Sequence, residues 1–493
     1  MTDPSSPEPA PGRASADRAS ADSTAADPTV GAGGAAAEPG PGRTIRSLWR
    51  HRDFMMLWSG QSVSEIGAAL TMVALPLTAV VVLHASTFQV GLLSAAGTVS
   101  FLLVALPAGL VVDRVRKRAL MIWCDISRML IIGSVPLAAA LGVLTMVQLF
   151  AVALLAGLAT VFFDVSYQSY VPTLIDRDRL HDGNGKIGAT QAFAQVAGPG
   201  LGGGLFGLLR AGAMAVNAGS YAVSALTLIM IRSREAKPRR AEPSAQVGVR
   251  PPAQPAGAAD TQQARRAGLA GLRGEIFAGL AFVARQPVLR KIAACTGTAN
   301  LFGSMATALE IIFLVRVLHV RPADTGLLLS LGSLGGIAGG VLSGRLSRWI
   351  GNARIIWFSM LVFGVVPIVM PLSEPGPRLA LFPIAIFGLS FTAVVYNVAQ
   401  LSYRQLICPP ELLGRMNAAI RWIVWGTLPL GGLLGGVLGS ASVLGVRPTI
   451  WVSVVGSWAV AFWVVFSPLR TMRDIPAQDL VTAASGEQSL VAA

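Results

Sequence analysis

The segment VLHASTFQVGLL, residues 82–93, returns as VLHVRPADTGLL, residues 317–328, and this repeat decides the fold. The histidine and the Gly-Leu-Leu tripeptide hold the same places in both copies, 235 residues apart. At the same separation, GLVVDRVRKRAL from Gly109 lies opposite GRLSRWIGNARI from Gly344. The chain is therefore predicted to consist of two copies of one structural unit.

The separation shortens further along the chain. It is 233 residues for four pairs of identical residues: Tyr170 with Tyr403, Leu180 with Leu413, Asn184 with Asn417, and Ile187 with Ile420. It is 230 residues for Pro199 and Pro429, each of which lies in a glycine-rich run. The repeat thus extends through both halves of the chain.

The composition places both copies in a lipid bilayer. Of 493 residues, 53% are hydrophobic and only 13% are charged, which is too apolar for a soluble protein of this size. The apolar residues form runs long enough to cross the hydrocarbon as helices, which takes about 20 residues. We count twelve such runs: 54–83, 88–112, 119–142, 147–171, 185–209, 212–231, 289–318, 324–344, 354–372, 378–402, 417–443 and 448–468.

We therefore predict an all-α membrane protein with twelve transmembrane helices, arranged as two six-helix bundles related by a pseudo-two-fold axis. The bundles occupy residues 43–233 and 268–470. Three segments rich in Pro, Ala, Gly and charged residues flank them and are predicted to be a flexible N-terminal tail, linker and C-terminal tail: 1–42, 234–267 and 471–493. The first of these lacks the apolar core of a signal peptide.

The distribution of basic residues predicts the orientation. With the N-terminus inside, all but six of the 39 Lys and Arg residues fall in cytoplasmic segments, which predicts cytoplasmic N- and C-termini in the cell membrane. This asymmetry, together with anionic lipid headgroups, explains the net charge of +14, so we do not expect a nucleic acid partner. The cysteines Cys124, Cys295 and Cys408 lack CxxC spacing and indicate neither disulfides nor a metal site, and no cofactor is expected.

Two motifs resemble those of the major facilitator superfamily, in its drug-efflux-like branch of macrolide and enterobactin exporters. The stretch GLVVDRVRKR is similar to the family's motif A, with Gly109, Asp113 and Arg114 in the expected positions and Arg116 in place of a second glycine. The second copy keeps that glycine as Gly351. The motif B arginine of helix four is missing, since Ala153 occupies its place.

The stretch AGPGLGG resembles the GPxxGG motif that the family associates with antiporters. It supplies Gly198, Pro199, Gly202 and Gly203, with Ala194 where the longer pattern has a glycine. A proline removes a helix hydrogen bond and glycine admits close backbone approach, so a bend or a tight helix contact is expected here. Glycines spaced by four at 332–344 and 431–439 predict further helix contacts.

Motif A has a physical interpretation of its own. A carboxylate at Asp113, at the end of the second helix, is stabilised by helix-terminal N–H groups and arginines of the other half, which would close the cytoplasmic side. The resemblance implies that Arg114 and Lys117 relay this contact to Asp164. The competing interpretation is topological anchoring by the basic cluster, which is our expectation for Arg116 and Arg118.

Burying an ionisable side chain in a membrane costs at least roughly 2.5–3.5 kcal/mol on the insertion scale, so each one requires a compensating role. Six lie within the predicted helices: Glu65, Asp125, Arg128, Asp164, Glu310 and Arg421. Asp125 and Arg128 share a helix face and most simply neutralise each other, although a role in proton coupling or substrate binding stays open.

Glu65 has no obvious partner in its helix, and Asn300 occupies its position in the repeat. We predict that Glu65 and Glu310, with Arg316 six residues after the latter, couple to protons or bind a cationic substrate. Other residues suited to line a cavity, for each of which packing is the alternative, are Trp58, Gln61, Phe163, Tyr167, Gln191, Asn300, Tyr396 and Asn397. The histidines at helix ends, including the repeated His84 and His319, are not expected to bind metal.

The predicted function is secondary transport: export of a small amphipathic molecule by proton antiport and alternating access. The expected partners are the lipid bilayer, the transported molecule and protons, and the expected assembly is a monomer. A proton-independent facilitator or an importer remains the alternative. A membrane enzyme or ATP-driven pump is disfavoured because HExxH, Gly-x-Ser-x-Gly and Walker motifs are missing from the sequence, and a receptor because it lacks a soluble domain.

Overall fold

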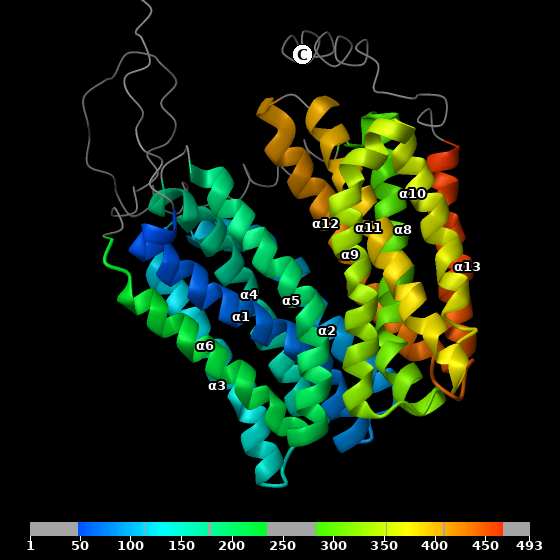
Figure 1. Ribbon diagram of the computed structural model, residues 1–493, viewed down its shortest axis with the longest axis horizontal. Helices are drawn as coiled ribbons and strands as arrows, with labels where there is room; N and C mark the ends of the chain where they lie inside the picture. Colours follow the sequence, from blue (N-terminus) through cyan, green and yellow to red (C-terminus); the bar gives the residue numbers. More distant parts are fainter. Residues whose placement is uncertain are drawn as a thin grey trace, which may run out of the picture. The chain divides into compact units, whose positions relative to one another are not determined.

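A computed structural model of the protein describes residues 48–112, 114–175, 179–233, 281, 283–351, 353–407 and 410–466. Within them the chain forms twelve α-helices of twelve or more residues (Figure 1). The first half contains α1 (Arg52–Leu77), α2 (Thr87–Val112), α3 (Lys117–Ala140), α4 (Met146–Leu174), α5 (Leu180–Leu209) and α6 (Ala213–Met230). The second half contains α8 (Pro287–Ile312), α9 (Pro322–Ile350), α10 (Arg354–Val365), α11 (Leu381–Ile407), α12 (Pro410–Leu438) and α13 (Val446–Val465). The predicted tails and linker lie outside the described residues.

The helices confirm the predicted number but shift some of the boundaries. α9 continues to Ile350 rather than ending at 344, and α12 covers 410–438 rather than 417–443. α10 ends at Val365 and continues as a 3-10 turn, where Pro367 interrupts the α-helical bonding. Hydropathy marks the lipid-buried stretch of a helix, whereas polar turns extend the helix beyond it.

The length and composition of the described helices suit a bilayer. Nine segments are long and apolar enough to cross one, and one of these, Asp182–Met230, contains both α5 and α6. Residues 354–369 form a shorter apolar helix, and α13 has 20 residues, about the length of one crossing.

The repeated Val-Leu-His sequence forms the same helix end twice. α1 and α8 each finish in a π-helical turn, Thr78–Val82 and Phe313–Val317, and the histidine that follows has a positive φ, 50° at His84 and 55° at His319. In both copies the next residue donates its N–H to a carbonyl six residues earlier, at 2.9 Å. We call the end of the bundle that carries these histidines the His84 end, and the opposite end, where α1 begins, the Arg52 end.

Glycines set the packing within each half, and they do so with the same contacts in both copies. A Cβ atom at Gly202 of α5 would lie 2.6 Å from the Leu70 oxygen of α1, and one at Gly435 of α12 would lie 2.6 Å from the Met305 oxygen of α8. Leu70 and Met305 are equivalent in the repeat. Helices α1 and α5, and helices α8 and α12, therefore approach at backbone distance.

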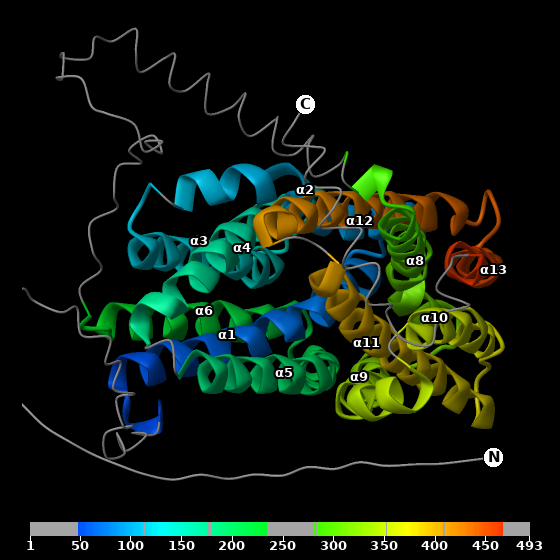
Figure 2. The ribbon, with the colours of Figure 1, turned by 90° about the horizontal axis from the view of Figure 1, so that it is seen from above.

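The neighbouring glycines join the two halves. A Cβ at Gly203 would lie 2.6 Å from Gly326 N in α9, and one at Gly436 would lie 3.0 Å from Gly91 Cα in α2. Gly91 and Gly326 are the glycines of the repeated Gly-Leu-Leu tripeptide. The pairs α5–α9 and α2–α12 lie side by side in Figure 2, and they carry the main contacts between the halves.

These contacts correct the predicted register of the glycine-rich helices. The equivalent of Pro199 is Gly432 at a separation of 233, rather than Pro429 at 230, since Pro199 O and Gly432 O each face the tripeptide glycine of the opposite half. The prolines misled the alignment because a single proline is a weaker marker of register than four glycine contacts.

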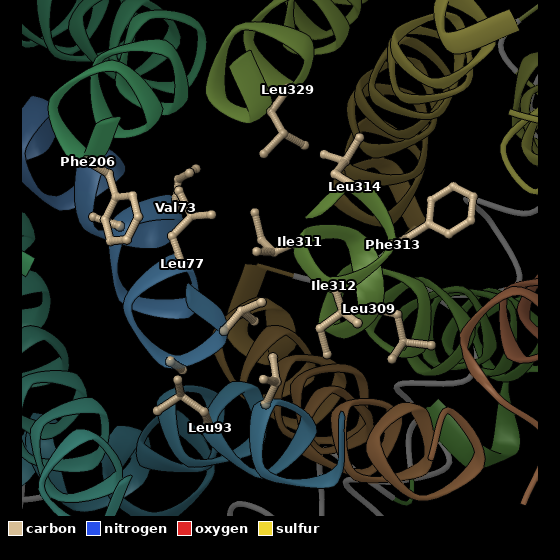
Figure 3. Close-up of a cluster of buried hydrophobic side chains, with 14 of the residues drawn as sticks. Val73, Leu77, Leu93, Phe206, Leu309, Ile311, Ile312, Phe313, Leu314 and Leu329 are labelled. Atoms are coloured by element: carbon tan, nitrogen blue, oxygen red, sulfur yellow. The ribbon is translucent and has the colours of Figure 1, made fainter. Parts of the chain in front are cut away.

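An apolar cluster fills the space between the halves at the His84 end (Figure 3). Val73 and Leu77 of α1 lie opposite Ile311 and Leu314 of the second half, and Leu329 of α9 completes the group. Leu77 and Leu314 are fully buried. The cluster is continuous across the two halves, so it seals this end against water in the observed conformation.

Arg316 adds a polar contact beside this seal. Its Nη2 donates to the Ala85 oxygen at 2.7 Å and lies 3.4 Å from the Val80 oxygen, so it bonds the first half's hairpin. The repeat places Val81 opposite Arg316, and the contact therefore has no symmetric counterpart.

Ser330 of α9 inserts its hydroxyl into the hydrogen-bond ladder of α5. Its Oγ accepts from Gly200 N at 2.7 Å and donates to Val196 O at 2.5 Å, the two groups that an α-helix pairs directly. Pro199 stands between them, and an inserted side chain is a recognised cause of a helix bend. Ser330 thereby fixes the shape of α5 from the opposite half.

Ser330→Ala is expected to loosen the closed His84 end by about 1 kcal/mol, roughly fivefold in the closed–open equilibrium, because two bonds between the halves are lost while Val196 and Gly200 can re-pair. Thiol labelling of a cysteine placed at Leu329, in purified protein without its three native cysteines, measures the opening. Ser333→Ala is the control, since the Ser333 hydroxyl bonds only its own helix, to Leu329 O at 2.9 Å. Equal labelling of the two variants would contradict the prediction.

Candidate functional site

A buried ion pair lies at the centre of the first half. Asp125 and Arg128 of α3 are 0% and 3% exposed, and Arg128 Nη2 donates to Asp125 Oδ1. The guanidinium carbon lies 4.2 Å from the ring centre of Phe163 in α4 and 4.3 Å from that of Tyr221 in α6. Arg128 is thus held between two aromatic faces as well as by its carboxylate.

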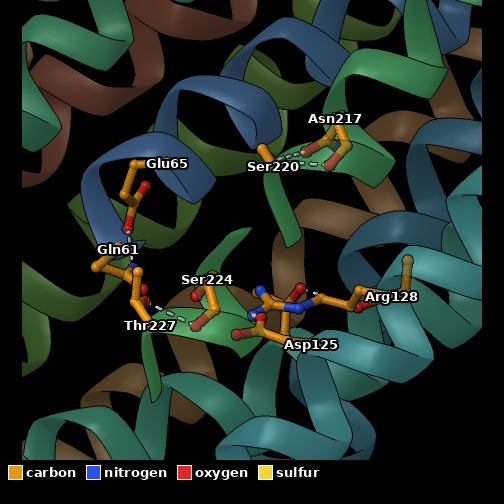
Figure 4. A network of polar contacts seen from close by, with 10 residues as sticks. Gln61, Glu65, Asp125, Arg128, Asn217, Ser220, Ser224 and Thr227 are labelled. Atoms are coloured by element: carbon orange, nitrogen blue, oxygen red, sulfur yellow. Dashed lines mark hydrogen bonds and ion pairs between the residues drawn. The ribbon is translucent and has the colours of Figure 1, made fainter. Parts of the chain in front are cut away.

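Two further carboxylates approach this pair from α1 and α4. Glu65 accepts a hydrogen bond from Gln61 Nε2 at 2.8 Å, and Figure 4 shows both side chains on α1 beside the Asp125–Arg128 pair. Asp164 of α4 is partly buried, and the charges within its range are Arg128 and Glu65. Among the described residues, the cation that acts on Asp164 is Arg128, and the relay from Arg114 and Lys117 to Asp164 stays a prediction.

The group contains more negative than positive charge. Arg128 is already neutralised by Asp125, and it also acts on Asp164, which in turn lies within electrostatic range of Glu65. Tyr167 lies within electrostatic range of Glu65 and Asp164, and its hydroxyl makes no hydrogen bond in the described structure. Glu65 and Asp164 are thus left to bind protons or a cationic group, with the Tyr167 hydroxyl nearby.

The second half carries amides and hydroxyls at the equivalent places. Asn300 replaces Glu65 and donates to Val424 O at 3.0 Å, while Asn397 replaces Asp164. The hydroxyls of Thr296 and Tyr396 are 2.7 Å apart, so Tyr396 is anchored to α8. Asn300 therefore packs α8 against α12, and the exposed Asn397 is the better candidate for contact with a substrate.

Glu310 lies apart from this group, toward the His84 end of α8. Thr307 Oγ1 is its hydrogen-bond partner at 3.4 Å, and Arg316, six residues later, bonds Ala85 of the first half. The two glutamates singled out by the sequence thus occupy different depths and different halves.

The structure also separates two other predicted cavity residues from the charged group. Trp58 donates its Nε1 to Lys186 O at 3.3 Å and stacks edge-on against Trp49 with ring centres 5.6 Å apart. Gln191 is exposed on α5. Trp58 therefore ties α1 to α5 near the Arg52 end, while Phe163 is the predicted aromatic residue that contacts Arg128.

The family model of the Major Facilitator Superfamily matches residues 57–428, three quarters of the chain. The chain belongs to the major facilitator superfamily. It is accordingly a multi-pass membrane protein with the fold of a transporter rather than that of an enzyme.

The curated relatives include the multidrug efflux pump Tap of Mycolicibacterium fortuitum. It is 27% identical over 389 residues, which cover 77% of this chain and 87% of the pump. Its similarity supports the drug-efflux-like branch suggested by the sequence.

Solved transporter structures share the fold. A variant of the nucleoside transporter NupG aligns with a TM-score of 0.67 at 12% identity, covering 84% of this chain and 100% of that chain. A bacterial homologue of the human lysosomal transporter Spinster, in an inward-facing conformation, aligns with a TM-score of 0.62 at 15% identity, covering 87% and 99%. At these identities the likeness establishes the architecture alone.

Only part of the family's motif A lies among the described residues. Gly109 lies in α2, Asp113 lies outside the described residues, and Arg114 is exposed. Lys117 Nζ donates to Ser169 O at 3.2 Å, which links the start of α3 to α4.

Arg118, expected from the sequence to be a topological anchor alone, caps a helix. Its Nε and Nη2 donate to Leu228 O and Ile229 O, at 2.8 and 2.7 Å, at the end of α6. Arg116 has φ −69°, whereas Gly351 in the second copy has φ 103°, so the second loop requires the glycine that the first has lost.

The GPxxGG motif is divided between two helix contacts. Gly198 and Gly202 pack on α1 of the same half, while Pro199 and Gly203 face α9 of the opposite half. The motif marks these residues in the sequence, but it does not show which of them pack within one half and which join the two halves. Ser330 has no sequence signal, because a single serine in a glycine-rich helix forms no distinctive pattern.

Proposed function

We propose that this chain is a secondary active exporter of a small amphipathic molecule, driven by proton antiport. The observation that carries the proposal is the surplus of carboxylates at Glu65 and Asp164, beside an ion pair that is already neutral. Carboxylates without cations inside a membrane protein are costly unless they exchange protons or bind a cation. Both actions are what an antiporter of cationic or amphipathic molecules requires.

Orientation follows from the charge asymmetry of the loops. We place the Arg52 end in the cytoplasm and the His84 end outside the cell membrane, with both termini cytoplasmic. Because the glycine contacts and the apolar cluster close the His84 end, the described conformation would then face inward. Alternating access would exchange this closure for one at the Arg52 end, where α2 ends at Val112 and Arg114 follows.

The two halves of the repeat have different proposed roles. We propose that the bundles 43–233 and 268–470 rock about the α5–α9 and α2–α12 contacts, joined by the linker 234–267, in a monomer surrounded by lipid. Glu65 and Asp164 would bind protons, with Asp125 and Arg128 as their fixed electrostatic environment. The efflux activity of the Tap pump supports export, whereas the nucleoside transporter among the structural neighbours keeps an importer or a facilitator as the alternative.

Glu65→Gln is expected to abolish gradient-driven movement of a lipophilic dye while leaving passive exchange down its concentration gradient. The substitution keeps the shape and the bond to Gln61 but removes the proton-binding oxygen. Everted vesicles with and without an imposed pH gradient provide the measurement.

Glu374→Gln is the matched control, because Glu374 pairs with exposed Arg378 at 2.7 Å, far from the group, and should leave transport unchanged. If the unmodified protein moves the dye equally with and without the pH gradient, the facilitator is favoured instead. A variant that retains full gradient dependence would exclude Glu65 from the proton path.

A further inference from the structure

The two halves carry their ionisable side chains at different positions of the repeat. The first half has Glu65 and Asp164 where the second has Asn300 and Asn397. Conversely, the second half has Arg404 of α11 where the first has Val171 of α4. The glycine contacts between helices are equivalent in the two halves. The halves therefore differ in the charge of these side chains rather than in their helix packing.

Arg404 is a buried cation with no carboxylate partner among the described residues. Arg404 is only 8% exposed, and its Nε makes no hydrogen bond in the described structure. Of the described residues, those within electrostatic range are Tyr396 and Arg421, and no carboxylate is among them. Arg421 carries the same charge as Arg404 and repels it, so this neighbour does not neutralise the Arg404 guanidinium.

Gln400 and Tyr396 extend this group along one face of α11, at intervals of four residues. Gln400 is 5% exposed and its Oε1 has no hydrogen-bond partner, while its Nε2 donates to Asn397 Oδ1 at 3.4 Å. Asn397 is exposed, so the row of polar side chains reaches an accessible surface. Tyr396 is fixed by Thr296 and supports the row at its far end.

A buried guanidinium without a partner is costly, and it recovers that cost when an oxygen anion binds. Its planar fork matches a carboxylate or phosphate in a bidentate arrangement. The amide of Gln400, one helical turn away, has a donor, Nε2, whose bond to Asn397 is long at 3.4 Å and can be exchanged for one to the same anion. The row Arg404–Gln400 therefore has the composition of an anion subsite, whereas Glu65 and Asp164 have that of a cation subsite.

We propose that the transported molecule is bipolar, with a cationic group bound by Glu65 and Asp164 and an anionic oxygen group bound by Arg404 and Gln400. This inference rests on the proposed function and names its substrate class. A zwitterion bound in this way would satisfy the charges of both halves at once. It would hold the halves together through the molecule itself.

Tetramethylrhodamine and its methyl ester provide a matched test, because they share one cationic ring system and differ in a free carboxylate. Binding of each dye to the purified protein, in nanodiscs of phosphatidylcholine, is measured by fluorescence anisotropy. We expect the zwitterion to bind about tenfold more tightly than the ester, as a charge-assisted bidentate bond provides. Arg404→Gln should remove this preference without weakening the ester.

Three further variants keep the test decisive. Arg404→Lys, which keeps the charge but not the fork, should retain part of the preference. Arg348→Gln, at an exposed arginine of the same half, should retain all of it. Asp164→Asn should weaken both dyes equally, because both carry the cation.

Equal binding of the two dyes by the unmodified protein, or no binding of either, would overturn the proposal. If phosphatidylglycerol in the nanodiscs abolishes the preference, Arg404 binds a lipid headgroup and the proposal also fails. Gradient-driven export of the ester alone would leave the proposed function standing while refuting the bipolar substrate, so the two failures are distinguishable.

Discussion

Replacing Gly203 with alanine is expected to prevent the two halves from closing fully at the His84 end. The added Cβ would lie 2.6 Å from Gly326 N and 3.0 Å from Ala323 O, both backbone atoms that cannot rotate away. Overpacking of this kind costs about 2 kcal/mol, which corresponds to roughly a thirtyfold shift toward the conformation open at the His84 end. The transport rate should also fall, because the conformation closed at the His84 end is disfavoured.

Labelling of a cysteine at Leu329 measures the shift, as for Ser330→Ala. Gly204→Ala is the control, since a Cβ at the adjacent Gly204 meets no atom within 4 Å. An unchanged labelling rate in Gly203→Ala would show that the α5–α9 contact does not limit closure.

The repeat extends this prediction to the other pair of helices. Gly436→Ala should open the same end, because its Cβ would lie 3.0 Å from Gly91 Cα across the α2–α12 contact. Gly202→Ala should behave differently, since Gly202 packs on Leu70 of its own half. We expect that variant to lower the thermal stability of the protein with little change in labelling.

The sequence predicted the architecture because the repeat and the hydropathy reinforce each other. Twelve apolar runs predicted the number of helices, and the repeated segment predicted a helix end at His84, whereas the crossing at Gly91 in the same segment was found only in the structure. The end of α9 and the start of α12 were missed because polar helical turns have no hydropathy signal.

The candidate site was less predictable than the fold. Spacing along one helix is visible in a sequence, which is why the Asp125–Arg128 pair was foreseen. Contacts between helices are not, so the proximity of Asp164 to Arg128, the aromatic faces around the guanidinium and the bond from Arg316 to Ala85 required the structure. Arg404 was overlooked because a basic residue near a helix end usually marks topology.

The two halves combine a symmetric skeleton with asymmetric charge. Symmetric glycine contacts allow both helix pairs to close in the same way, whatever the side chains nearby. Under the proposed mechanism, protons act on the first bundle through Glu65 and Asp164, while the second bundle responds through the bound molecule. A duplicated chain can thus keep equivalent helix contacts in both halves while the charges of the surrounding side chains differ.

Arg128→Met is expected to destabilise the protein by about 3–5 kcal/mol, the cost of breaking a buried ion pair from one side. Asp125, which is 0% exposed, would lose its counter-charge, and its Oδ2 already has no hydrogen-bond partner in the described structure. The loss is measured as a fall in the thermal unfolding midpoint of the purified protein.

The double variant Asp125→Asn, Arg128→Met separates the two roles of the arginine. If Arg128 acts mainly by neutralising Asp125, the double variant should recover most of the lost stability, because a neutral amide and an apolar chain can share the site. If the double variant is as unstable as Arg128→Met alone, the guanidinium stabilises α3 through the rings of Phe163 and Tyr221 instead. Recovery of stability without recovery of gradient-driven transport would then assign the pair its remaining role, that of the fixed charge beside which Glu65 and Asp164 exchange protons.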